Sequence, residues 1–149
     1  MELLKLLKKE SAFYSSLIHG VKHWRRVEKN GLYLANFNYA DKAVISYFVY
    51  LHDCMRENED QDSEHGLRAA LFAKKHRELI DLNKKQFQQL ILACEGHTNG
   101  ERADCVTINT CWDADRLDLG RVGIQPDSAY LYSPEAKRIA DSNSFNVLM

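Results

Sequence analysis

The 149-residue chain is poor in the residues that mark several classes of protein. It contains two prolines, seven glycines and four cysteines, and no two cysteines have C-x-x-C spacing. So little proline and glycine excludes a collagen-like repeat and a long flexible linker. The sparse cysteines argue against a disulfide-rich secreted scaffold and against a zinc knuckle. We therefore expect reduced thiols in a cytoplasmic protein.

An excess of charge of one sign is also lacking. Lysine and arginine number 20 and aspartate and glutamate 21, so the net charge is −1. No overall basic field exists to recruit a nucleic-acid polymer or an anionic membrane. The longest nearly apolar run, 43–51, is far shorter than the roughly 20 residues of a membrane-spanning helix. Charged residues also interrupt the leucines near the amino terminus, unlike a signal peptide.

What is present is an ordinary globular composition, with 45% apolar residues. This length and composition predict one domain over 1–149, with a core at about 15–125 and a carboxyl-terminal extension at about 126–149. The extension carries Tyr130, Leu131 and Tyr132 ahead of a polar string. It could cover a site or contact the partner subunit of a homodimer, and the sequence leaves both interpretations open.

Apolar residues recur with helical spacing in several segments. Four of them between Phe87 and Cys94 fall at i, i+3, i+4 and i+7, which predicts an amphipathic helix over 84–97. Asn83, with Gln86 three residues later, is a plausible start for it. The same pattern predicts a helix over 106–119.

Two further segments are predicted less directly. A helix over 63–79 would place Leu67, Ala70 and Leu71 along one side. Around 43–51, β-branched and aromatic residues favour a strand, whereas length and unbroken apolarity suit a buried helix. Because no second strand of similar strength exists to pair with it, an all-α domain is the consistent prediction.

Polar side chains break these apolar stripes at three places. Asp115 stands where the stripe that begins at Ile108 needs its next member, and His97 follows Leu90 on the same face. The apolar segment 43–51 runs directly into His52 and Asp53. A carboxylate that faces a core needs a partner, because burying it uncompensated costs several kcal/mol. Histidine and aspartate are also side chains that bind divalent metals.

Each exception also has a purely structural interpretation. A core histidine such as His97 more often donates to a backbone carbonyl than binds a ligand. An inward Asp115 could pair with Arg116 or Arg121. His19, His23 and Arg26 lie at i, i+4 and i+7 on one predicted helical face, a spacing that also arises by chance.

The ordered set of motifs resembles the HD-domain superfamily of metal-dependent phosphohydrolases. His23 in HGVKHWRRV, the doublet His52-Asp53 and Asp115 in DADRLD are similar to its H…HD…D signature, which spans about 19–124 of this chain. The resemblance implies a compact all-α bundle of about five or more helices. It thereby favours the helical interpretation of 43–51, which periodicity alone does not establish.

The resemblance also implies a set of metal ligands. His23, His52, Asp53 and Asp115 match the signature, and His65 and His97 stand where two-metal members add histidines. Asp53 could then bridge two ions. The cofactor would be one or two divalent ions, with Mn, Fe, Zn, Ni, Co and Mg as candidates. The other acids of DADRLD, Asp113 and Asp118, would then support the ligands or face solvent, and His19 would contact substrate or be structural.

Residues near these ligands suggest further roles. If the helix continues past the doublet, Arg56 and Glu57 lie one turn beyond it on the same face. Arg56 could clamp a phosphate, and Glu57 could orient a water or protonate the leaving group; equally, both could be exposed loop residues. Arg26, in a basic cluster with Lys22, Arg25 and Lys29, is a candidate phosphate contact.

A hydrolase of a nucleotide or another small phosphate ester is the function that this resemblance favours. Arg56-Glu57 replaces the acidic pair that follows the doublet in alarmone hydrolases, and the Gly-Tyr-Pro signature of the cyclic-dinucleotide branch is absent. Both of those substrates are therefore doubtful. Two other hypotheses stay open: a di-iron oxygenase on the same frame and a non-catalytic, metal-stabilised regulatory module.

Overall fold

The computed structural model describes residues 1–99 and 102–149. Within these residues there is no strand, and the regular structure consists of helices. The α-helices are α1 (Glu2–Glu10), α2 (Val21–Asn38), α3 (Lys42–Leu51), α4 (His65–Lys75), α5 (Lys84–Gly96), α6 (Val106–Arg116) and α7 (Pro134–Ser142). Short 3₁₀ helices are η1 (Arg77–Leu79), η2 (Leu119–Val122), η3 (Ser128–Tyr130) and η4 (Phe145–Leu148). The predicted all-α class is confirmed.

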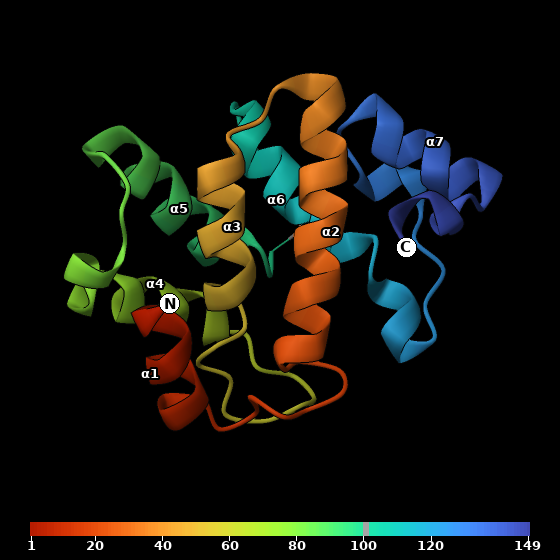
Figure 1. The fold of residues 1–149 in the computed structure, drawn as a ribbon. Coiled ribbons are helices and arrows are strands. Elements are labelled where there is room, and N and C mark those ends of the chain that lie inside the picture. Colours follow the sequence, from red (N-terminus) through yellow and green to blue (C-terminus); the bar gives the residue numbers. More distant parts are fainter. Residues whose placement is uncertain (100–101) are drawn as a thin grey trace.

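The helices α2 and α3 form the centre of the bundle, and the others surround them. In Figure 1, α6 passes behind this pair, α4 and α5 lie on one side, and α7 lies on the other. α1 lies beside the lower half of α3. Among the described residues, no helix combines the length and the apolar character needed to cross a membrane.

Local sequence signals account for where these helices begin. The side chain of Asp41 accepts hydrogen bonds from the N–H groups of Ala43 and Val44 and starts α3. Asn83 and Gln86 form the predicted capping box of α5. The ambiguous segment 43–51 is helical, and it lacks a clear period because α3 is packed by neighbours on most of its circumference.

The buried face of α4 is not the predicted one. Leu67 and Leu71 are 45% and 54% exposed, whereas Ala69, Ala70 and Ala73 are buried. Small side chains let two helices approach closely, and α4 packs its alanine face against α5. The predicted helix over 63–79 is also shorter, because α4 ends at Lys75 and η1 follows it.

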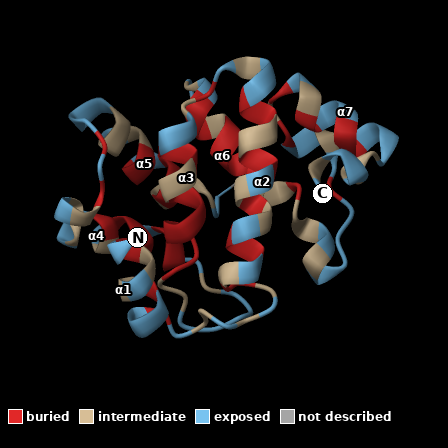
Figure 2. Ribbon diagram, in the orientation of Figure 1, coloured by how far each residue is buried: buried red, intermediate tan, exposed pale blue. Residues whose placement is uncertain are grey.

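The core extends beyond the predicted limits of 15–125. Leu3 and Leu7 of α1 are fully buried in the main core, which Figure 2 shows in red along α3 and the inner faces of its neighbours. A second cluster joins α7 to α2, with Ile139 against Leu34 and Leu117. The extension is therefore packed onto the bundle.

Candidate metal centre

Six predicted ligand residues meet at one place inside the bundle. They come from α2 (His23), the end of α3 (His52, Asp53), the start of α4 (His65), the end of α5 (His97) and the last turn of α6 (Asp115). They form two groups, each with one nitrogen or oxygen per residue and all these atoms within 4.8 Å of one another: His23, His52 and Asp115; and Asp53, His65 and His97.

Asp53 lies between the two groups, and each of its carboxylate oxygens faces one of them. Oδ1 is 2.9 Å from Nε2 of His65 and 3.4 Å from Nε2 of His97. Oδ2 is 3.4 Å from Nε2 of His23 and 3.6 Å from Nε2 of His52. Burial alone would raise the pKa of Asp53, but the surrounding imidazoles, His52 foremost, hold it well below its usual range.

Four imidazoles are oriented by hydrogen bonds at their outer nitrogens. Each Nδ1 lies against an oxygen that can only accept, so in the neutral imidazole Nδ1 carries the proton and Nε2 presents a lone pair to the centre. For His23, His52, His65 and His97 the acceptors are, in order, Asp118 Oδ2 at 2.7 Å, the Val49 carbonyl at 3.0 Å, the Asp62 carbonyl, and the Cys94 carbonyl at 2.7 Å.

These lone pairs face one another at short distances. The Nε2 atoms of His65 and His97 are 2.8 Å apart, and those of His23 and His52 are 3.2 Å apart. Two unprotonated nitrogens repel unless a proton or a cation neutralises them. Asp115 Oδ1 is buried nearby without a hydrogen-bond partner among the described residues. The donor set of imidazole nitrogens and carboxylate oxygens therefore fits a divalent cation.

The pKa of His23 also indicates that positive charge is favoured at the centre. Burial lowers the pKa of His23, but the neighbouring carboxylates of Asp115, Asp118 and Asp53 outweigh it and raise this pKa to about 10. In the metal-free protein, a proton on His23 offsets the carboxylates around it.

Asp118 supports His23, as one of the two sequence interpretations predicted. Its Oδ2 accepts the Nδ1–H of His23, and both carboxylate oxygens accept the Nε–H of Arg26, at 2.9 and 3.1 Å. Arg26, the predicted phosphate contact, is thus tied to Asp118 through Nε, while its side chain remains 43% exposed.

Asp113 has neither of the predicted roles. It is fully buried, and it neither touches the cluster nor faces solvent. It accepts hydrogen bonds from the backbone N–H groups of Tyr132 and Ser133 and from the Ser133 hydroxyl. Sequence spacing gave no signal for this contact, because it joins α6 to the carboxyl-terminal segment.

The helix does not continue past the doublet, which was the condition for placing Arg56 and Glu57 on its face, because α3 ends at Leu51 and a turn follows. Arg56 still approaches the centre, with Nε 3.5 Å from Asp53 Oδ1. Glu57 does not: its side chain is 72% exposed and lies 3.5 Å from Arg68. The role predicted for Glu57 therefore has no support from its position.

His19 does reach the centre. Its Nε2 donates to the Glu59 carbonyl at 3.2 Å, which leaves the lone pair of Nδ1 directed toward Asp53 Oδ2 at 3.4 Å. Nδ1 is buried and has no hydrogen-bond partner among the described residues. The predicted ligands include four histidines, and His19 is a further histidine that lies beside them.

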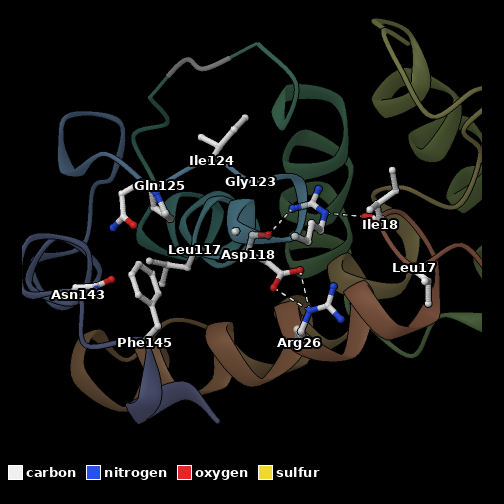
Figure 3. Close-up of a pocket in the computed structure, with 13 residues that line it drawn as sticks. Leu17, Ile18, Arg26, Leu117, Asp118, Gly123, Ile124, Gln125, Asn143 and Phe145 are labelled. Carbon is white, nitrogen blue, oxygen red and sulfur yellow. Dashed lines mark hydrogen bonds and ion pairs between the residues drawn. The ribbon is translucent and has the colours of Figure 1, made fainter.

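Two adjoining cavities lie beside the centre. One, of about 550 Å³, has His97 and Asp115 in its wall together with apolar side chains such as Leu119 and Leu131. The other, of about 780 Å³, is lined by Arg26, Asp118 and Arg121 among others (Figure 3). Both include residues 124–126. The sequence suggested Arg121 only as an ionic partner of Asp115, so its place in a cavity wall was not predicted.

The fold is similar to a solved one. In a crystal structure described as a predicted HD superfamily hydrolase from an uncultured Thermotogales bacterium, the match covers 98% of this chain and 86% of that chain. The TM-score is 0.74 at 22% sequence identity. No family model and no curated protein matches the chain. The chain therefore has the HD-domain fold.

Proposed function

We propose that this protein is a metal-dependent phosphohydrolase that acts on a nucleotide or another small phosphate ester. One observation carries the proposal: two groups of metal-competent side chains adjoin, Asp53 lies between them, and His97 and Asp115 border a cavity large enough for a small molecule. The hydrolase description of the Thermotogales protein is consistent with it.

The ligand set follows from the two groups. His23, His52 and Asp115 would hold one divalent ion, His65 and His97 a second, and Asp53 would serve both. Such ions supply a Lewis acid for a phosphoryl oxygen and a bound water of lowered pKa.

The chain itself orients these ligands and shapes the approach to them. Asp118 holds the imidazole of His23 in the tautomer that directs Nε2 inward. His19 offers the lone pair of Nδ1 next to Asp53, where it can accept a hydrogen bond from a water or a substrate hydroxyl. Leu119 and Leu131 make one wall of the cavity apolar.

The test is elemental analysis of protein purified without chelators or an affinity metal. It is paired with a Mn²⁺-supplemented assay over nucleotides and an aryl phosphate. We expect about one to two ions per chain and phosphate release, since each group offers three donors. The variant Asp53→Ala, purified and assayed in parallel, controls for contaminating phosphatase.

Two outcomes would overturn the proposal. Two irons per chain, oxygen-dependent turnover and no phosphate release would indicate the oxygenase that the same paired groups could also support. Protein that takes up no metal would indicate a non-catalytic module.

A further inference from the structure

Two arginines contact Asp118 in the wall of the 780 Å³ cavity, and Figure 3 shows one of them, Arg26, beside Asp118. Arg26 donates from Nε to both carboxylate oxygens of Asp118, and Arg121 donates from Nη1 to its backbone carbonyl at 2.9 Å. Among the described residues that line this cavity, these three carry the charged side chains. The wall of the cavity thus carries two guanidinium groups and one carboxylate, and Asp115, which belongs to the neighbouring centre, lies 3.9 Å from Arg121.

Arg121 is held in place before any ligand arrives. Its side chain is 10% exposed, and its Nε donates to the Ile18 carbonyl at 2.6 Å. The remaining nitrogen, Nη2, lies 3.9 Å from Asp115 Oδ1, beyond hydrogen-bond distance. A guanidinium fixed in this way loses little further freedom when an anion binds to it.

The rest of the cavity suits the body of an organic molecule. Part of its wall is formed by apolar side chains, those of Leu17, Leu117, Ile124 and Phe145. This cavity adjoins the one that reaches Asp115, because residues 124–126 line both.

We propose that Arg121 and Arg26 bind a second anionic group of the substrate, a carboxylate or a phosphate. The reacting phosphate would lie at the candidate metal centre. This inference rests on the proposed function and narrows it. The preferred substrates are phosphate esters that carry another anionic group on a short carbon skeleton. A simple monoester with a neutral remainder is a poorer ligand.

The test uses phosphonates, which cannot be hydrolysed. The metal-loaded protein is titrated calorimetrically with ω-carboxyalkyl phosphonates of two to four carbons, each compared with the plain alkylphosphonate of the same carbon number. At least one carboxylated member is expected to bind about tenfold or more tightly than its partner, because it gains a charge-assisted hydrogen bond. Arg26→Gln and Arg121→Gln are expected to remove that difference.

A matched variant separates local binding from general charge. Arg25 is the exposed neighbour of Arg26 on α2, so Arg25→Gln removes the same charge outside the cavity and is expected to preserve the difference. Arg121→Lys keeps the charge but loses the planar guanidinium group with its several N–H donors. Its affinity difference between the two phosphonate series is expected to fall between those of wild type and Arg121→Gln. This variant also serves if the buried Arg121→Gln fails to fold.

Metal content of every variant is measured alongside. A merely structural role for the two arginines, acting through Asp118 and His23, predicts weaker metal binding with the carboxylate preference intact, and that result overturns the inference. Metal-loaded wild type that binds both phosphonate series equally overturns the inference alone. Protein that takes up no metal, or neither binds a phosphonate nor hydrolyses a phosphate ester, overturns the proposed function and the inference with it.

Discussion

Asp113 accepts hydrogen bonds from both the backbone N–H and the hydroxyl of Ser133, each at 2.7 Å. Ser133 immediately precedes α7, so this contact attaches the carboxyl-terminal segment to α6. Two residues further along the chain, Asp115 belongs to the candidate metal centre. One short helix thus supplies a group for the centre and the anchor for the segment that carries Leu131, and Leu131 lines the same cavity as Asp115.

Replacing Asp113 by alanine is expected to destabilise the protein by about 2–5 kcal/mol, because several buried donors lose their acceptor. Burial raises the pKa of Asp113, so a neutral acceptor is tolerated and Asp113→Asn is expected to cost less. Urea denaturation measures both. The exposed Asp141→Ala serves as control, and an Asp113→Ala protein as stable as that control would contradict the anchoring role.

Replacing Asp53 by alanine is expected to abolish bound metal and phosphatase activity while nearly preserving helix content, because Asp53 faces both groups of ligands. His97→Ala removes a donor from one group alone and is expected to reduce a two-ion content to about one. Elemental analysis and circular dichroism report the two quantities. Full activity in Asp53→Ala would refute the ligand assignment.

Gly66 lies where α4 crosses the end of α5. A Cβ at this position would be 2.4 Å from the Cys94 carbonyl oxygen and 3.2 Å from Nδ1 of His97, so it would intrude on the hydrogen bond that orients His97. Gly66→Ala is expected to cost about 1–3 kcal/mol of stability and to lower metal content.

The matched control for this change is Gly120→Ala, since a Cβ at 120 meets nothing within 4 Å. Thermal unfolding and metal analysis compare the two variants. Equal behaviour would show that the close approach of α4 to α5 does not constrain the centre.

The thiols are expected to differ in reactivity. Cys54, Cys94 and Cys111 are buried, and burial raises the pKa of each thiol, so the reactive thiolate is scarce. Cys105 is partly exposed. Iodoacetamide at about pH 8, just below the ordinary thiol pKa of about 8.5, should therefore label Cys105 alone in the native protein, and all four cysteines in guanidinium.

Intact-mass measurement counts the labels, and Cys105→Ser is expected to take up none in the native state. Rapid native labelling of more than one thiol would mean that the core opens more readily than its burial indicates.

Much of the candidate centre could be predicted because its residues interrupt otherwise regular patterns. Asp115 and His97 break apolar stripes, and His52-Asp53 ends an apolar run. The side on which α4 is buried could not be predicted, because both an alanine face and a leucine face are apolar, and the shape of α5 selects the smaller one. His97 satisfied both interpretations, since it donates from Nδ1 to a carbonyl and also directs Nε2 to the centre.

The sequence by itself determined the helical class, the capping box of α5 and the identity of the side chains that interrupt the apolar faces, because these depend on neighbours a few residues away. Only the tertiary structure decided that α3 ends at Leu51 and does not include Arg56. It also decided that Asp113 accepts a hydrogen bond from Ser133, and that Arg121 lies in a cavity wall near Asp115. Each of those outcomes depends on the path of a connecting segment or on contacts between residues distant in the chain, and local spacing carries no information about either.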